Sequence, residues 1–276
     1  MTKDLTQTQT KLLAMFKWFH AFCVEHRLRY YALGGTMLGA VRHQGFIPWD
    51  DDIDVGMPPQ DYLRCIELMQ KNTTGNYVVE SPVNPGQDFW YPFAKMYDTS
   101  TTVVENTAAR IKRGICIDIF PLAGMADTMR EAKQNYQKLA WRLNLVLGHI
   151  AGIRHGRRWY KNMFIRAVRF LPDWLVQYQQ LYSQIHHLST QIDFDSKAYG
   201  GNLCGAYRCK EIMPRDFFGA PTLYSFEDTQ IFGVEKPDEY LTHLYGNWRQ
   251  IPPKEKRKTH HDFITIDLNK SYLSEN

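Results

Sequence analysis

The sequence predicts an α+β fold, with a small mixed sheet flanked by helices and a helical C-terminal extension. Residues 1–125 alternate between helical spacing of apolar residues and short strand-like runs that end at Gly, Pro or Asn. Residues 126–200 carry helical spacing and many cations, and residues 201–276 break into short pieces that we expect to fold back on the core. The chain has 276 residues, which is enough for one large domain with such an extension.

The N-terminal part of the core is expected to hold three helices and two strands. Leu12, Phe16 and Phe19 recur at the spacing of one helix face. Thr36 can cap the start of a second helix, and Pro58-Pro59 can open a third, because proline is tolerated in a first helical turn. The predicted elements are a helix through 12–23, a strand at 30–33, a helix at 37–41, a strand at 53–57 that runs beside the first, and a helix that begins at 58–59.

Strands dominate the next part of the chain, and helices follow them. Clusters of Asn, Gly, Pro and Ser separate the strand-like runs. The predicted strands cover 77–79, 93–97, 101–104 and 115–120, and the predicted helices cover 127–150, 159–170 and 173–187.

Composition excludes several classes of protein. No apolar stretch reaches the ~20 residues that a membrane-spanning helix needs. The N-terminus lacks the apolar region of a signal peptide, and the five scattered cysteines are too few for a disulfide scaffold. We therefore expect a cytoplasmic protein with reduced thiols.

Residues 132–172 form a strongly basic segment, with nine Lys or Arg and no Asp or Glu. A basic amphipathic helix can lie on an anionic membrane surface, or it can pack on the core with its cations in water. Peripheral contact with the inner face of a membrane is therefore one expectation for this segment. No nucleic-acid recognition motif accompanies it, so we expect no nucleic-acid partner.

Three acids in strand-like surroundings indicate a metal site. Asp52 and Asp54 stand two apart at the start of a predicted strand, so their side chains point to the same side. Two such carboxylates repel each other unless a cation lies between them, and oxygen ligands suit Mg²⁺ or Mn²⁺. Asp118 is a single acid in an apolar strand-like run, where an unpaired acid is costly. It either completes the metal shell or accepts the proton of an attacking hydroxyl. The other interpretation is an acidic, solvated loop before an ordinary edge strand.

The glycines ahead of this cluster favour contact with a phosphate. Gly34 and Gly35 end a predicted strand, and Thr36 begins a predicted helix. Glycine allows close approach of the backbone, and the first amides of a helix attract anions, although a Gly-Gly pair also serves in plain turns. Together with the three acids, this arrangement is typical of metal-dependent phosphoryl or nucleotidyl transfer.

These motifs resemble the LicD family, which includes the fukutin proteins. The resemblance is dense over about residues 28–61 and thinner further along the chain. The residues that carry it are Gly34-Gly35-Thr36, Leu38-Gly39, Arg42, Gly45, Ile47-Pro48-Trp49 and Asp50 to Asp54, followed by Lys95 to Asp98, Gly114 to Leu122 and Tyr245 to Trp248.

The resemblance implies a nucleotidyltransferase-like catalytic core over 1–125 and a phosphotransferase activity. It also implies that Asp52, Asp54 and Asp118 are catalytic and bind the metal, and that Gly34, Gly35 and Thr36 lie against the phosphates of the donor. Typical bacterial members of the family transfer phosphocholine from CDP-choline to a sugar of a cell-surface glycan, and animal relatives transfer ribitol phosphate from CDP-ribitol. The implied partners are CDP-choline or another CDP-alcohol, and a sugar acceptor on a surface glycan or its lipid-linked precursor.

Two cations could add phosphate contacts. Arg42 lies one helical turn beyond the glycines, and Lys95 lies on a predicted strand between aromatic residues. Each could instead form a surface salt bridge.

Two other functions remain open. A true nucleotidyltransferase would use a nucleoside triphosphate and release pyrophosphate, and the same carboxylates would serve it. A non-catalytic subunit of a surface-polymer assembly complex would bind a nucleotide or a glycan, but it would not need three converging acids.

Three weaker features have a functional and a plain interpretation. The aromatic run at 89–93 could hold a quaternary ammonium group or pack in the core. Cys204 and Cys209 stand five apart, which is a poor spacing for zinc. His260-His261 could contact a phosphate or lie exposed in a charged tail.

Overall fold

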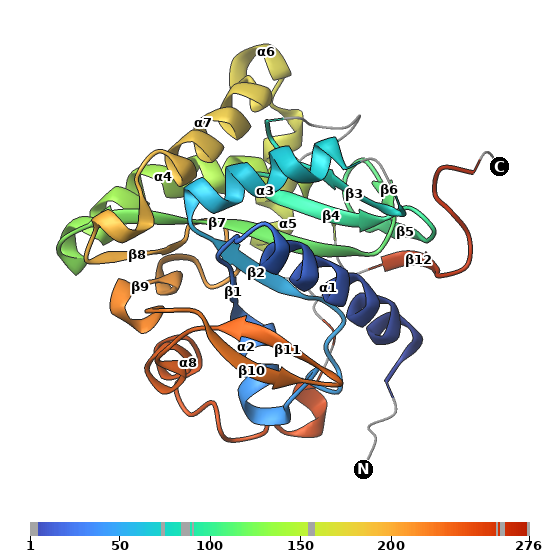
Figure 1. Ribbon diagram of the computed structural model, residues 1–276. Coiled ribbons are helices and arrows are strands. Elements are labelled where there is room, and N and C mark those ends of the chain that lie inside the picture. The colour runs from blue at the N-terminus through green and yellow to red at the C-terminus, as the bar shows by residue number, and fades with distance from the viewer. Residues whose placement is uncertain are drawn as a thin grey trace.

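A seven-stranded mixed sheet crosses the middle of the molecule in the computed structural model (Figure 1). The structure describes residues 5–72, 75–83, 89, 91–153, 158–257, 259 and 263–274. Five strands run in the order β1-β2-β7-β4-β3, while β8 pairs with β7 and β9 pairs with β8. Figure 1 shows α3 and α7 above the sheet, with α2, α8 and the β10–β11 hairpin below it. The predicted α+β class is confirmed.

The helices and strands follow the predicted order through the first half of the chain, except for the short strand β6, which was not predicted. The strands are β1 (Tyr31–Ala32), β2 (Asp54–Met57), β3 (Tyr77–Glu80), β4 (Ala94–Asp98), β5 (Thr102–Glu105), β6 (Lys112–Arg113), β7 (Cys116–Ala126), β8 (Tyr199–Asn202), β9 (Ile212–Pro214), β10 (Thr222–Phe226), β11 (Thr229–Gly233) and β12 (Phe263–Asp267). The helices are α1 (Gln7–Glu25), α2 (Gly34–His43), α3 (Pro59–Lys71), α4 (Met129–Ile150), α5 (Trp159–Phe170), α6 (Asp173–Val176), α7 (Tyr178–Thr190) and α8 (Pro237–Tyr245).

Local chemistry explains where several helices begin. The Thr6 hydroxyl accepts a hydrogen bond from the Gln9 N–H at 3.1 Å, and the Gln9 side chain accepts one from the Thr6 N–H. This capping box starts α1. Proline occupies the first turns of α3 and α8, where its missing N–H costs nothing.

The long strand β7 joins two parts of the molecule. Its first half pairs in parallel with β2 and antiparallel with β4, and its second half pairs antiparallel with β8. The first half lies in the large core that α1, α2 and α3 cover, where Ile117 and Ile119 are fully buried. The second half contributes Ala123 to a smaller core under α4 and α7. The division of the chain at residues 125 and 200 stays a prediction.

The predicted helix at 173–187 is corrected to two pieces. Gln177 has a φ of 50°, so α6 ends at Val176 and α7 begins at Tyr178. A left-handed residue breaks the helical hydrogen-bond pattern, and the apolar spacing alone gave no sign of it.

The last part of the chain packs against the first. Tyr224 and the rest of the β10–β11 hairpin lie beside α2, and β12 pairs antiparallel with β5. No helix among the described residues is long and apolar enough to cross a membrane.

Candidate active site

The sheet register places Asp54 directly beside Asp118. The two residues are partners in the parallel pairing of β2 and β7, so their side chains project from the same face. The Asp54 N–H donates to the Thr36 hydroxyl at 2.9 Å, and its carbonyl accepts from the Leu33 N–H at 3.0 Å. The start of β2 is therefore held between α2 and β7, with two carboxylates side by side.

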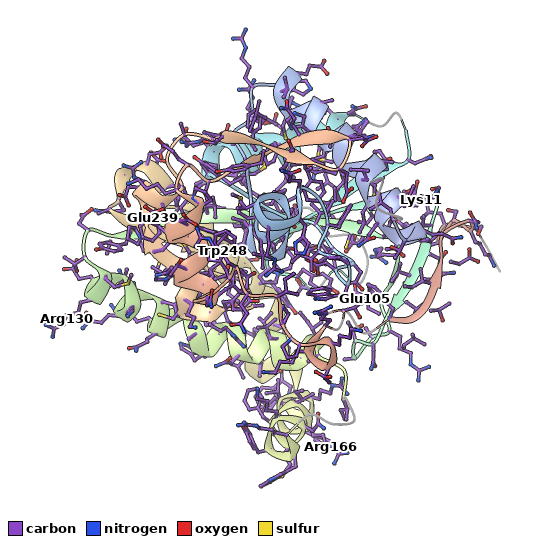
Figure 2. All side chains as sticks on the ribbon, turned by 90° about the horizontal axis from the view of Figure 1, so that it is seen from below. Lys11, Glu105, Arg130, Arg166, Glu239 and Trp248 are labelled. Carbon is purple, nitrogen blue, oxygen red and sulfur yellow. The ribbon has the colours of Figure 1, made fainter. Side chains whose placement is uncertain are left out.

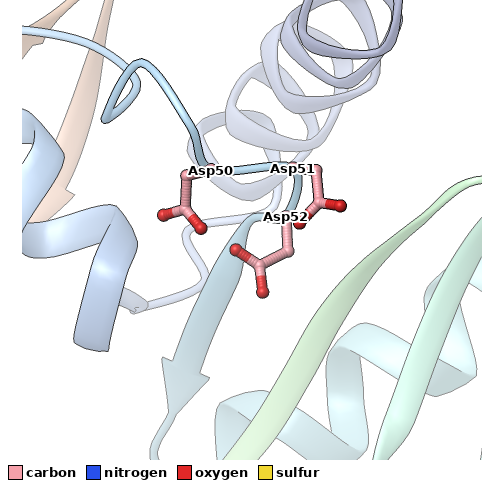
Figure 3. Close-up of side chains that lie close together, drawn as sticks. All are labelled: Asp50, Asp51 and Asp52. Atoms are coloured by element: carbon pink, nitrogen blue, oxygen red, sulfur yellow. The ribbon is translucent and has the colours of Figure 1, made fainter. Parts of the chain in front are cut away.

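Three more acids lead into β2 as a tight group. Asp50, Asp51 and Asp52 each offer a carboxylate oxygen, and these oxygens lie within 4.8 Å of one another. Figure 3 shows the three side chains on the turn that precedes the strand. Of these three acids, the sequence interpretation assigned only Asp52 to the metal.

Electrostatics make this concentration of acids unfavourable without a cation. Burial raises the pKa of Asp54 well above its usual range, and Asp52, Asp118 and Asp50 raise it further. A set of converging carboxylate oxygens fits a hard divalent cation such as Mg²⁺ or Mn²⁺. The acidic residues can therefore hold a metal. Whether the ligands are Asp52, Asp54 and Asp118 or the close group Asp50–Asp52 stays a prediction.

Lys95 forms a buried ion pair with Asp118. Its Nζ atom lies 2.7 Å from Asp118 Oδ1, with side-chain exposures of 4% and 15%. The same atom lies 4.3 Å from the centre of the Tyr91 ring and 5.5 Å from that of Phe93. Burial lowers the pKa of Lys95, but Asp118 and other neighbours outweigh it and raise this pKa well above its usual value. Lys95 therefore holds a positive charge against one of the site acids.

The surroundings of Lys95 affect two interpretations of the sequence, that of the aromatic run at 89–93 and that of Lys95 as a phosphate contact. The Tyr91 and Phe93 rings face the Lys95 ammonium, so two rings of the predicted aromatic run already hold a cation of the protein. A direct contact of Lys95 with a donor phosphate stays a prediction.

The glycines lie at the N-terminus of α2, next to the acids. Gly34 has a φ of +48°, and a Cβ there would lie 3.9 Å from Asp54 Oδ2. A Cβ on Gly35 would lie 2.7 Å from Asp50 Oδ2, so only glycine lets that carboxylate approach the first turn. A carboxylate is favourable at this positive end of the helix dipole. The contact of Gly34, Gly35 and Thr36 with donor phosphates stays a prediction.

The predicted helix cap at Thr36 is corrected. Helix α2 begins at Gly34, with Leu33 as its N-cap and no side-chain capping bond. Thr36 lies in the first turn, where its hydroxyl binds the Asp54 N–H instead.

Arg42 lies in the last turn of α2, at the opposite end from the glycines. Eight residues at ~1.5 Å each separate it from Gly34, which is about 12 Å or two turns along the helix, so the expected separation of one turn was wrong. Its Nη1 atom donates to the Trp248 carbonyl at 2.7 Å, and burial lowers the pKa of Arg42. Arg42 thus ties α2 to the C-terminal segment, and its contact with a phosphate stays a prediction.

The C-terminal segment brings residues to the site that sequence reasoning missed. The Gly34 N–H donates to the Tyr240 hydroxyl at 3.0 Å. A Cβ on Gly34 would lie 3.6 Å from the Tyr245 hydroxyl, and the Tyr245 ring meets Tyr207 edge-on at 5.2 Å. The motif around Tyr245 gave a weak signal for this contact. Tyr207 and Tyr240 gave none, because each lies more than 170 residues from Gly34.

Glu211 is a buried acid behind these tyrosines. It is 8% exposed, and its Oε1 atom accepts from the Tyr207 N–H at 3.0 Å. It adds to the negative surroundings that raise the pKa of Asp54. Burial raises the pKa of Glu211 itself to about 7.

This raised pKa predicts a pH-dependent stability. The folded protein holds the Glu211 proton more tightly than the unfolded chain, so stability falls as pH rises from the ordinary Glu value to about 7. The free energy of unfolding of Glu211→Gln, taken relative to that of the parent, should therefore rise by up to ~3 kcal/mol between about pH 4 and about pH 8. Urea unfolding at both pH values measures this difference. Glu239→Gln, at an exposed position, is the control. An equal dependence of stability on pH in both variants would contradict the raised pKa of Glu211.

Two openings border the acids. One is lined by Asp51, Asp52, Asp118 and Glu105, together with Phe263 and Ile266 from β12. The other, a cavity of about 450 Å³, extends from Asp50 and Asp51 past Trp49 to the same two β12 residues. The acids are therefore accessible from a concave face that β12 helps to form.

Cys204 and Cys209 do not belong to the acidic group at this site. Among the described residues, Asp50–Asp52 is the group of three close ligand atoms, and neither Cys204 nor Cys209 belongs to it. His260 and His261 lie outside the described residues.

Comparison with known proteins agrees with this geometry. Residues 27–145 match the family described as LicD/FKTN/FKRP, nucleotidyltransferase domain. The chain carries a nucleotidyltransferase domain of the LicD/FKTN/FKRP family. The matched residues include Asp52, Asp54 and Asp118, and the resemblance inferred from the motifs is confirmed.

Two kinds of relative show how far along the chain the similarity extends. The chain is 29% identical over 264 residues to the Lipopolysaccharide cholinephosphotransferase LicD of Haemophilus influenzae, across 93% of this chain and 96% of that protein. It is 46% identical over 41 residues to the Ribitol 5-phosphate transferase FKRP of human and of mouse, across 15% of this chain and 8% of those proteins. The LicD similarity therefore extends through the helical and C-terminal parts, whereas the FKRP similarity is confined to a short segment.

Proposed function

We propose that this LicD-family protein is a metal-dependent transferase that moves phosphocholine, or a similar alcohol phosphate, from a CDP-activated donor to a sugar hydroxyl. The acceptor would be a cell-surface glycan or its lipid-linked precursor. The observation that carries the proposal is the near full-length similarity to a lipopolysaccharide cholinephosphotransferase. The pairing of Asp54 with Asp118 beside the Asp50–Asp52 group supports it.

The reaction exchanges one phosphorus–oxygen bond for another. The acceptor oxygen forms a bond to the phosphorus that carries the alcohol, the bond from that phosphorus to the bridging oxygen of the diphosphate breaks, and CMP leaves. Negative charge gathers on the oxygens around phosphorus in such a transfer, so catalysis depends on positioning and on nearby positive charge.

Different side chains would hold the metal and accept the proton of the acceptor hydroxyl. Asp52, with Asp54 and Asp118 or with Asp50 and Asp51, would hold Mg²⁺ or Mn²⁺. When bound, the cation would neutralise charge on the phosphate oxygens. In the alternative role of Asp118, its carboxylate accepts the proton of the sugar hydroxyl, while the ion pair with Lys95 holds that carboxylate in position.

Titration calorimetry tests the donor. CDP-choline, CDP-ribitol, CDP-glycerol, CDP-ethanolamine and CTP are titrated into the protein with and without Mg²⁺. We expect one CDP-alcohol to bind preferentially and only with the metal. Incubation of that donor with a sugar acceptor should then release CMP. Binding of CTP alone, with release of pyrophosphate on turnover, would contradict the proposal and favour a true nucleotidyltransferase.

A turnover assay distinguishes a non-catalytic binding subunit from the proposed enzyme. A nucleotide- or glycan-binding subunit would bind a CDP-alcohol without releasing CMP in the presence of any acceptor. The five clustered acids favour the enzyme, because a binding protein for anionic phosphates gains nothing from carboxylates at its site.

A further inference from the structure

Helix α5 packs on the molecule through one narrow face. Ile165 and Val168 are buried, and Val168 belongs to the core cluster that α4 also lines. Gly148 of α4 permits this approach, since a Cβ there would lie 3.1 Å from Phe164 and 3.2 Å from Val168. The helix thus has an inner apolar stripe that accounts for its attachment.

The opposite face of α5 is also apolar, although it points into solvent. Trp159, Met163 and Phe170 are spaced i, i+4 and i+11, so they lie on one side of the helix, and they are 71%, 56% and 87% exposed. Trp174 in the following α6 is 77% exposed. An outer helix face is normally polar, and a contiguous group of exposed large apolar side chains marks an interaction surface.

Cations flank the apolar side chains of α5, and α5 itself contains no acid. Arg166 stands in the same row, between Met163 and Phe170. Lys161 is exposed on the same helix, and Arg158 is exposed at its N-cap. The sequence has no Asp or Glu from 132 to 172. Figure 2 shows Arg166 on a segment that projects from the body of the molecule. A flat anionic surface could therefore reach these side chains without meeting the rest of the protein.

Charge and residue type together indicate which partner binds the exposed face of α5. A second copy would bring the same cations against each other, which is unfavourable. Tryptophan and phenylalanine favour the boundary between lipid headgroups and acyl chains, and Lys and Arg attract anionic headgroups. We infer that Trp159, Met163, Arg166, Phe170 and Trp174, here called the α5–α6 face, form a docking surface for an anionic lipid bilayer.

Flotation with vesicles tests this inference without any substrate. The full chain is mixed with vesicles of phosphatidylcholine alone, or of equal parts phosphatidylcholine and phosphatidylglycerol, and centrifuged through a density gradient. We expect the protein to float with the anionic vesicles at low salt, to float less at high salt, and to stay behind with the neutral vesicles. The double variant Trp159→Ala/Phe170→Ala should lower the floated fraction by roughly tenfold.

Matched variants test whether vesicle binding depends on the α5–α6 face or on exposed apolar side chains in general. Leu223→Ala/Leu273→Ala removes two apolar side chains that are 48% and 65% exposed on other parts of the surface, and it should float like the parent. Lys161→Gln/Arg166→Gln should lose the salt-sensitive part of binding. All three should keep the parent melting temperature, because the altered side chains are exposed.

Three results would overturn the inference. The first is absence of flotation with anionic vesicles at low salt. The second is equal flotation with neutral vesicles. The third is a parent dimer, seen by sedimentation velocity, that Trp159→Ala/Phe170→Ala converts to a monomer, because the face would then be an interface between copies. None of these results depends on the donor or on turnover, so the docking surface and the proposed transferase activity can fail separately.

Discussion

Replacing Asp54 with Asn is expected to lower turnover by roughly 10³-fold or more while leaving the protein folded and at least as stable as before. Asp54 is the β2 partner of Asp118, and burial and the neighbouring acids raise its pKa. Removing its charge therefore relieves repulsion in the metal-free protein, even though it removes a proposed ligand. Release of CMP measures turnover, and thermal unfolding without metal measures stability.

The control for this change is Asp127→Asn. Asp127 is an exposed acid that pairs with Lys197 at 2.9 Å, away from the sheet face that carries Asp54. It should keep the turnover of the parent. Turnover of Asp54→Asn close to that of the parent would remove Asp54 from the active site.

Comparison of Asp54→Asn with a second variant, Asp51→Asn, decides between the two metal sets. Binding of Mn²⁺, followed by electron paramagnetic resonance, should weaken in Asp54→Asn if Asp52, Asp54 and Asp118 are the ligands. It should weaken more in Asp51→Asn if the close group Asp50–Asp52 is the site. Unchanged Mn²⁺ binding in both variants would contradict a metal at either set.

Replacing Lys95 with Met is expected to destabilise the protein by about 3–5 kcal/mol. The change leaves the Asp118 carboxylate without its 2.7 Å partner, in a place where both side chains are largely shielded from water. An unpaired buried charge costs far more than the pair contributed. Urea unfolding measures the loss.

Two further variants make this test specific. Lys197→Met breaks the pair with Asp127, whose side-chain exposures are 35% and 63%, and should cost less than ~1 kcal/mol. The double change Lys95→Met/Asp118→Asn removes both charges and should recover much of the lost stability. An equal cost for Lys95→Met and Lys197→Met would show that Lys95 does not neutralise a buried acid.

Sequence reasoning was most successful where the signal is local. The alternation of acids with Ile53 and Val55 predicted a strand with carboxylates on one face, and β2 carries Asp54 in that position. The apolar run around Asp118 predicted β7 in the same way. A strand repeats every two residues, so a few neighbouring residues suffice to reveal it.

The same reasoning was weaker for the helices. Apolar spacing located α4 and α5 closely, but it ran through the break at Gln177. The capping signal of Thr36 placed the start of α2 at Met37 rather than at Gly34. Both errors concern residues with positive φ, which the spacing of apolar side chains does not report.

The chain by itself therefore determined the α+β class, most of the order of its elements up to about residue 190, and the acids that meet on β2 and β7. Only the tertiary structure decided what surrounds those acids. Lys95 meets Asp118 because β4 pairs with β7 in one particular register, and Asp50 meets Gly35 because a turn returns to α2. Glu211 and Tyr245 reach the site because the C-terminal segment packs back on the core. Local patterns encode which side of an element is apolar, whereas these contacts depend on register and long-range packing, which arise from the whole core at once.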